Sequence, residues 1–192
     1  QIRLLRTRYL PKIGFKNSFW QKGYECDDVI ASITQNSISP DDQVVIVSAD
    51  KDFRQLIRHN VMLYNPNSAK RTTLQSFTKE FGIKPSKWAQ VLMLSGCRTD
   101  NVKGAPGIGD TTALKYIRGE LKESSKAFQS IHDFKLRGLN RRLVKLPFEG
   151  TKKFGLVKDE ITMHGWNEVC DELGIKSLRN QSPRKPKQSL LD

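Results

Sequence analysis

The sequence of 192 residues has few cysteines and no long apolar run. Cys26, Cys97 and Cys170 are odd in number and far apart, which argues against a disulfide framework and gives no zinc-type spacing. No stretch approaches the roughly 18 to 20 apolar residues that a membrane span requires, and the start does not resemble a secretory signal. We therefore expect an intracellular protein in a reducing compartment, without a membrane partner.

Acidic residues are also scarce. The chain has 33 Lys and Arg against 20 Asp and Glu, a formal net charge of +13. This excess favours a polyanionic partner, nucleic acid first, although a basic ribosomal protein would share it. The first 24 residues contain no acid and interleave cations with the aromatic residues Tyr9, Phe15, Phe19, Trp20 and Tyr24. Such a mixture is typical of surfaces that bind nucleic-acid backbones and unpaired bases, and it equally suits a helix with an aromatic core face.

Hydrophobic patterns predict alternating elements in the first third of the chain. A helix is expected from Tyr24 to about Thr34, followed by buried strands at "QVVIVSAD" and "NVMLY" with a short helical "KDFRQLI" between them. This order favours an α/β fold with a largely parallel sheet and flanking helices. After Pro66 we expect mainly helices, at about 72–81, 85–95, 125–134, 138–146 and 165–173.

Three acidic clusters stand out against the basic background. They are Glu25 with Asp27 and Asp28, then Asp50 with Asp52, and finally Asp100. The second cluster follows a predicted strand, where open α/β sheets usually place their chemistry. Each cluster alone is better explained by helix capping. Their joint occurrence at one predicted sheet edge favours bound divalent metal, because converging carboxylates repel one another and hard cations prefer oxygen ligands.

A glycine-rich stretch, "NVKGAPGIGDTTALKYI", is the second candidate site. Gly104, Gly107 and Gly109 allow a tight turn and close approach of the backbone to a ligand. A helix is expected from about Thr111, and its first amide groups suit a phosphate. No P-loop is present, because no "GK[ST]" follows the glycines. A plain turn before a helix is the alternative.

These motifs carry a family resemblance. "GYECDDVIAS", "VVIVSADKDFRQL" and "SGCRTDNVKGAPGIGDTTALKYI", in this order, resemble the structure-specific 5′ nucleases, the flap endonuclease and 5′-3′ exonuclease family of bacterial DNA polymerase I and phage exonucleases. Three ordered motifs over roughly residues 20–120 are more specific than any one. The resemblance implies a PIN-like core and metal-dependent hydrolysis of flapped, nicked or 5′-ended DNA, or of RNA–DNA hybrids, in DNA replication and repair. A bacterial or phage-infected cell is the implied setting.

The resemblance also implies the metal ligands. Two Mg²⁺ ions, or Mn²⁺, are expected on the six acids already named. Glu25 and Asp27 match the first metal site, with Asp27 between the two ions and Asp28 in support. The acids that match the second site are Asp50, Asp52 and Asp100. Lys51 is expected either to steady the phosphate or to point away and make a surface contact.

"NVKGAPGIGDTTALK" resembles the family's helix-three-turn-helix element, which grips the duplex backbone. A potassium ion held by main-chain carbonyls is implied, with Val102, Ala105 and Ile108 as candidate donors. The residues expected to contact DNA are Lys103, Gly104, Gly107, Gly109, Thr111, Lys115 and Arg118.

Two features depart from the family pattern. Cys97 stands where a second-site aspartate is expected, and the adjacent Arg98 adds positive charge. Mg²⁺ prefers oxygen to thiolate, so a weakened or altered second site is expected. No acid precedes Glu25, although the family supplies first-site carboxylates from an upstream strand. The chain also opens on Gln1 rather than methionine, so we expect it to be part of a longer protein, without which the first metal site would be incomplete.

Three parts are expected in the chain: the carboxyl-terminal part of the nuclease core at 1–66, a helical DNA-binding region at 67–176 and a basic disordered tail at 177–192. The alternatives to a 5′ nuclease are a non-catalytic, structure-specific DNA-binding module and a related metal-dependent ribonuclease, against which the glycine hairpin argues. The terminal "QSLLD" resembles sliding-clamp-binding peptides, but a disordered end is the favoured interpretation. A monomer is expected.

Overall fold

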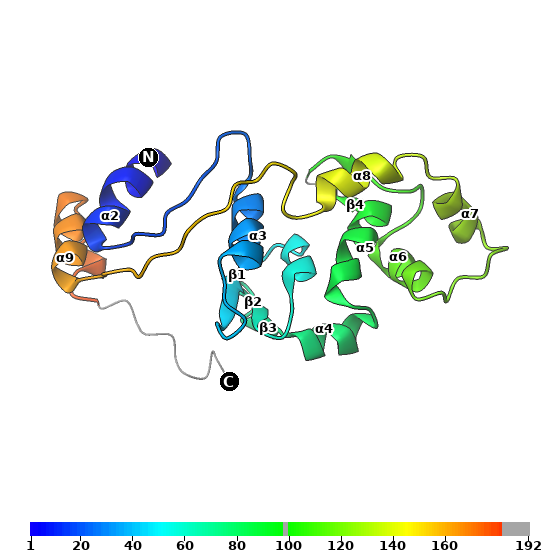
Figure 1. The fold of residues 1–192 in the computed structure, drawn as a ribbon, viewed down its shortest axis with the longest axis horizontal. Helices are drawn as coiled ribbons and strands as arrows, with labels where there is room; N and C mark the ends of the chain where they lie inside the picture. Colours follow the sequence, from blue (N-terminus) through cyan, green and yellow to red (C-terminus); the bar gives the residue numbers. More distant parts are fainter. Residues whose placement is uncertain (98–99, 182–192) are drawn as a thin grey trace. The chain divides into compact units, whose positions relative to one another are not determined.

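The computed structural model describes residues 1–97 and 100–181. Arg98 and the terminal "QSLLD" lie outside these residues, so the expectations about them stay predictions. Two compact units are present: Gln1–Trp20 with the described residues from Phe154 onward, and Gln21–Lys153 (Figure 1). The boundary expected at residue 66 lies inside the second unit and also stays a prediction. No helix of the described chain is long and apolar enough to cross a bilayer.

The first unit is built from helices at both ends of the sequence. They are α1 (Ile2–Leu4), the π-helical η1 (Leu5–Tyr9), α2 (Leu10–Ile13), α9 (Met163–Glu172) and the 3-10 helix η4 (Lys176–Leu178). Gly14 ends α2 with a φ of 109°, which only glycine adopts readily. α2 packs against α9, where Lys12 bonds to Glu172 at 3.3 Å, and Arg8 of η1 pairs with the same carboxylate. Part of the N-terminal positive charge is thus paired within the unit.

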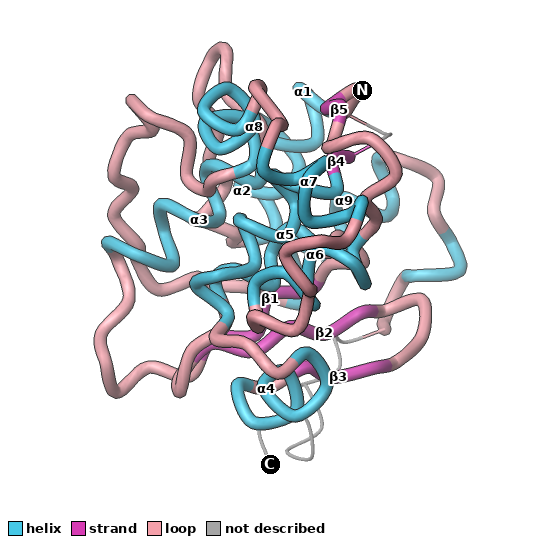
Figure 2. Tube along the Cα trace, turned by 90° about the vertical axis from the view of Figure 1, so that its right-hand side faces the viewer, coloured by secondary structure: helices cyan, strands magenta, loops and turns pink. Residues whose placement is uncertain are grey.

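The second unit contains a small mixed sheet with strand order β1-β2-β3 (magenta in Figure 2). Its strands are β1 (Val44–Val47), β2 (Val61–Asn65) and β3 (Lys70–Thr72). β1 and β2 are parallel, with Ile46 opposite Leu63, whereas β2 and β3 are antiparallel. The expectation of a largely parallel sheet is corrected here, because the four-residue turn at 66–69 can join only antiparallel strands.

Helices are the main regular elements of the second unit, and they lie close to where periodicity predicts them. They are α3 (Cys26–Asn36), η2 (Asp52–Leu56), α4 (Leu74–Phe81), η3 (Pro85–Lys87), α5 (Trp88–Ser95), α6 (Asp110–Ile117), α7 (Lys126–His132) and α8 (Arg137–Val144). Two short strands, β4 (Gly96–Cys97) and β5 (Val102–Lys103), pair antiparallel just before the glycine hairpin. Neither this pair nor β3 was expected from the sequence.

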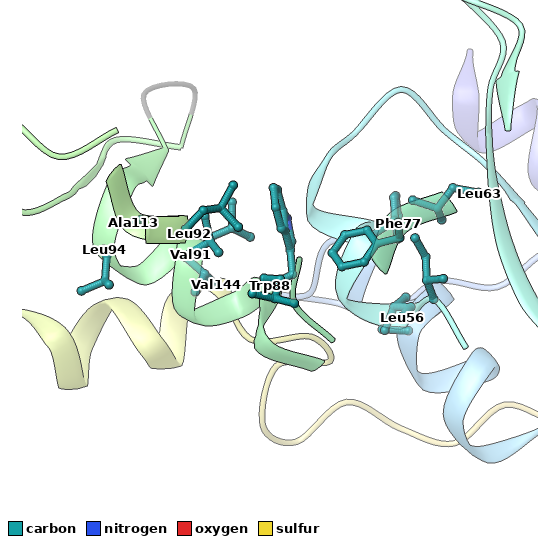
Figure 3. Packing of buried hydrophobic residues seen from close by; sticks show 14 of the residues in the cluster. Leu56, Leu63, Phe77, Trp88, Val91, Leu92, Leu94, Ala113 and Val144 are labelled. Carbon is teal, nitrogen blue, oxygen red and sulfur yellow. The ribbon is translucent and has the colours of Figure 1, made fainter. Parts of the chain in front are cut away.

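One apolar core joins the sheet to the helices of the second unit (Figure 3). Trp88 at the start of α5 packs edge-on against Phe77 of α4, with ring centroids 5.7 Å apart. α5 also packs against η2, α6 and α8. The buried side chain of Asn140 donates hydrogen bonds to the carbonyls of Met93 (3.0 Å) and Lys103 (2.8 Å), which ties α8 to α5 and to β5. This packing sets the positions of the acidic segments and the hairpin.

Candidate active site

Acids from three separate segments line one cavity in the second unit. Its volume is about 650 Å³, within the range of sites that hold small ligands or parts of larger ones. The lining acids are Glu25, Asp27, Asp28, Asp50, Asp52 and Asp100. The fold therefore brings together all six of the acids that the sequence singled out, from the start of α3, the loop after β1 and the turn before β5.

The first segment has its acids at the start of α3, and they differ in their contacts. Asp28 is buried, with 7% of its surface exposed, and its carboxylate accepts hydrogen bonds from the N–H groups of Glu25 (3.2 Å) and Phe148 (2.7 Å). Asp27 accepts a bond only from the Cys26 thiol, at 3.2 Å, among the described residues. The capping interpretation therefore holds for Asp28, whereas Asp27 keeps its oxygens available to the cavity.

The second segment runs from the loop after β1 into the first residue of η2. Asp50 accepts a hydrogen bond from the N–H of Asp52 at 2.8 Å, which closes a tight turn. The buried Oδ1 of Asp52 has no hydrogen-bond partner among the described residues. Lys51 lies between them in sequence but bonds to Asp110 at the start of α6, at 3.2 Å. Of the two expectations for Lys51, the structure therefore shows the second: its ammonium group pairs with Asp110, outside the cavity lining, although its charge still lowers the pKa of Asp52 against the rise that burial causes.

Two of the cavity acids, Asp27 and Asp52, have raised pKa values. Burial, followed by the charges of Asp50 and Asp100, raises the pKa of Asp52 to about 6. Burial is also the main cause that raises the pKa of Asp27, and the carboxylates of Asp50, Asp28 and Asp100 add to it. The carboxylates of all three segments thus interact electrostatically. Ionising all of them at once is unfavourable unless a cation is bound.

The donor set of the cavity fits a hard divalent cation. The cavity offers carboxylate oxygens, which hard cations prefer as ligands. The Oδ1 of Asp52 has no hydrogen-bond partner among the described residues and could bind such an ion. A bound cation would also reduce the repulsion between the carboxylates. Within residues 1–97 and 100–181, no three side chains of His, Cys, Asp or Glu already stand close enough to bind one ion together. The chemistry therefore fits, and the ligands are gathered in one cavity without being preassembled.

The other wall of the cavity is apolar and was not foreseen from the sequence. It is lined by Val102, Leu143, Val144, Leu146 and Phe148. Side chains far away in the sequence hold the segment at 144–152, which contains most of this wall. Gln55 accepts a hydrogen bond from the Leu146 N–H and donates one to the Val144 carbonyl, and Ser32 donates one to the Lys152 carbonyl. No local motif could have signalled these contacts, because they join positions about 90 to 120 residues apart.

The glycine hairpin forms a tight turn into α6. A side chain at Gly104 would meet main-chain atoms of Ser95 and Leu94, so packing alone requires glycine there. Gly107 has a φ of 73°, and Gly109 is the N-cap of α6. The Ala105 carbonyl already accepts the Ile108 N–H at 3.1 Å. The potassium site expected here stays a prediction.

The remaining candidates for DNA contact lie around this hairpin. Lys103, Thr111 and Lys115 are exposed, and Lys115 makes no ion pair with another described residue. Arg118 instead donates to the Phe81 carbonyl at 3.1 Å and pairs with Glu120 at 2.7 Å. Lys115 is thus the cation of α6 that is most available to a ligand.

Comparison with protein families and curated sequences identifies relatives of this chain. Residues 2–82 match the family model described as "5'-3' exonuclease, N-terminal resolvase-like domain". A 5'-3' exonuclease of Aquifex aeolicus is 38% identical over 96 residues, 50% of this chain and 33% of the relative. A 5'-3' exonuclease of Buchnera aphidicola is 30% identical over 149 residues, 77% of this chain and 51% of the relative. DNA polymerase I of Pseudomonas aeruginosa is 36% identical over 98 residues, 51% and 11% of the two chains.

Solved structures with the same fold include 5′ nucleases of bacteriophage T5. A T5 5'-exonuclease with bound zinc superposes with a TM-score of 0.57 at 23% identity, over 67% of this chain and 52% of that one. A T5 flap endonuclease complex with DNA and metal ions gives 0.60 at 22%, over 67% and 52%. These likenesses show a resolvase-like 5′ nuclease fold of mixed α and β content. The chain spans about half or less of the length of the curated relatives named above.

Proposed function

We propose that the chain is a member of the structure-specific 5′ nuclease family and takes part in metal-dependent hydrolysis of phosphodiester bonds in flapped, nicked or 5′-ended DNA, or in RNA–DNA hybrids. The observation that carries the proposal is the gathering of six carboxylates from three segments in one cavity. Relatives named 5'-3' exonuclease and a neighbour solved with DNA and metal ions support it.

Two divalent cations, Mg²⁺ or Mn²⁺, are proposed for the cavity. Glu25 and Asp27, with Asp28 in support, would hold one, and the acids of the second would be Asp50, Asp52 and Asp100. Such ions lower the pKa of a bound water and stabilise the leaving oxygen of the phosphate. Asp28 also fixes the apolar wall through its bond to the Phe148 N–H, so it positions the cavity as well as contributing charge.

The glycine hairpin and α6 are proposed to bind the duplex next to the cut. The residues involved would be Lys103, Gly104, Gly107, Gly109, Thr111, Lys115 and Arg118, with K⁺ at the carbonyls of Val102, Ala105 and Ile108. The bond from Lys51 to Asp110 links the acidic loop to the first residue of α6. A duplex held on α6 would thereby be kept in register with the carboxylates.

A cleavage assay tests the proposal. With Mg²⁺ and a 5′-labelled flap duplex, the protein is expected to release short labelled products, and Asp27→Ala to lower the rate by at least about 100-fold, the loss expected when metal assistance worth several kcal/mol is removed. Asp41→Ala is the matched control, because Asp41 is an exposed acid outside the cavity. Equal rates for Asp27→Ala and the control would contradict the proposal.

A second candidate is a non-catalytic module that binds branched DNA. It is favoured by Cys97 in β4, where the family pattern has an acid. Tight binding of the flap duplex without cleavage at any Mg²⁺ or Mn²⁺ concentration would select it.

A further inference from the structure

Helix α8 exposes a row of leucines. Leu136, at the N-cap, and Leu139 and Leu143 within the helix have exposed fractions of 43%, 53% and 51%. Their spacing of three and four residues puts them on one face, while Asn140 and Val144 lie buried on another. A contiguous row of exposed leucines is uncommon on a soluble surface and usually marks a contact with a partner.

This row continues into the carboxylate cavity. Leu143, at its carboxyl-terminal end, lines the cavity together with Leu146 and Phe148. Phe148 is itself 37% exposed. Exposed apolar side chains are therefore present both on the outer face of α8 and, through Leu143, on the wall of the cavity that faces the six acids.

The segment that carries the row has positive charge only. Residues 134–148 contain no Asp or Glu, and their exposed cations are Lys135, Arg141, Arg142 and Lys145. Arg142 follows Leu139 by three residues and therefore lies next to the leucine row. Arg141 lies about 100° from Arg142 around the helix axis, on the side away from the leucines. Within the described residues, the guanidinium groups of Arg141 and Arg142 make no hydrogen bond or ion pair.

We propose that α8 binds an unpaired strand of the nucleic acid, with bases against Leu139 and Leu143 and a phosphate on Arg142, and that this strand leads into the cavity. The inference rests on the proposed function and adds a site to it. Apolar side chains, leucine included, pack against base faces in nucleic-acid complexes, and flanking cations bind the backbone. The cationic flank at residues 134–148, which contains no acid, complements the phosphates of such a strand.

Binding of a single strand tests the apolar part of the site. The probe is a fluorescein-labelled 12-nucleotide oligodeoxythymidylate, followed by anisotropy in EDTA so that metal and cleavage play no part. Leu139→Gln is expected to weaken binding by about 3- to 10-fold, less than the loss of an aromatic stacking partner. Leu74→Gln, at an exposed leucine of α4 in the same unit, is the matched control and should change binding by less than about twofold.

Binding of a blunt duplex of the same sequence separates a base contact from a general loss of affinity. The duplex should bind the Leu139→Gln variant as it binds the wild type, because stacking covers both faces of every base pair except the terminal two, which each expose one face. Equal losses for the strand and the duplex would overturn the inference, as would unchanged binding of the strand.

The cationic part is tested by salt dependence. Arg142→Gln should reduce the slope of log affinity against log salt by about 0.7 for the single strand, the value for one lost phosphate contact. Arg141→Gln is the control on the same helix and should leave the slope unchanged. Equal effects of the two variants would overturn the proposed placement of the strand.

Two further outcomes keep this inference separate from the proposed function. If the oligonucleotide binds through Leu139 but no flap is cleaved, the inference stands and the nuclease activity fails. If sedimentation shows that the protein is a dimer that Leu139→Gln dissociates, the leucine row is a contact between copies and the inference is wrong.

Discussion

At the scale of single residues, the six acids divide into different roles. Asp28 is satisfied by two main-chain N–H groups, whereas the buried Oδ1 of Asp52 has no partner in the described chain. The sequence picked out both acids but could not separate them, because the second bond of Asp28 comes from Phe148, 120 positions away. Asp52 is therefore the acid whose energetics should respond most to metal and pH.

Removing the Asp52 charge should stabilise the metal-free protein near neutral pH. The folded-state pKa of about 6 lies above the ordinary value of 3.8, so folding is favoured by protonation. The resulting stability is complete below about pH 4 and is lost as the pH rises through about 6. In EDTA at pH 7.5, Asp52→Asn should raise the melting temperature by about 2–4 °C, the shift that about 1 kcal/mol produces at this size.

Thermal unfolding at pH 4 supplies the control for this prediction, because both side chains are then neutral and the gain should largely disappear. The exposed acid variant Asp41→Asn should show no such dependence. A gain for Asp52→Asn that is equal at both pH values would show that the carboxylate charge is not its cause.

At the scale of elements, strong periodic patterns predicted most of the fold. α3, β1, β2 and α5 each lie within two or three residues of the expected ranges, because each buries a regular apolar face. β3 and the β4–β5 pair escaped prediction because they are two or three residues long and have no alternating pattern. The apolar wall of the cavity could not be predicted either, since tertiary contacts alone hold that irregular segment.

The glycine hairpin gives a prediction at this scale. Gly104→Ala should lower the free energy of unfolding by about 2 kcal/mol or more in a urea titration, because the new methyl group meets main-chain atoms of Ser95 and Leu94, which cannot move independently. Gly138→Ala, in α8 where the same methyl group meets nothing, should instead raise it by up to about 1 kcal/mol. Equal effects of the two substitutions would show that the hairpin does not need glycine for packing.

At the scale of the whole molecule, the net charge of +13 is the dominant feature. Part of it is used internally, as in the pairs of Arg8 with Glu172 and Lys16 with Glu160. Lys115 has no such partner among the described residues and lies on α6 after the hairpin. Fewer cations are therefore available to a polyanion than the composition indicates, and each cation has to be judged by whether an acidic side chain already pairs with it.

Duplex binding should report this difference. Lys115→Gln should reduce the slope of log affinity against log salt by about 0.9, as expected for one lost phosphate contact on duplex DNA. Lys79→Gln, at an exposed lysine of α4, should leave the slope unchanged. Anisotropy of a labelled duplex between 50 and about 200 mM salt measures both slopes. An unchanged slope for Lys115→Gln would remove α6 from the duplex contact.

The most direct test of the central claim is metal binding itself, measured by isothermal titration calorimetry of the intact chain with Mn²⁺ and Mg²⁺. The account predicts saturable binding that Asp27→Ala weakens by at least about tenfold, because one charged ligand of a carboxylate site is removed. The Asp41→Ala control should bind as the wild type does. Saturable binding that is identical in Asp27→Ala, or no binding by the wild type, would contradict the claim that these carboxylates form a divalent-metal site.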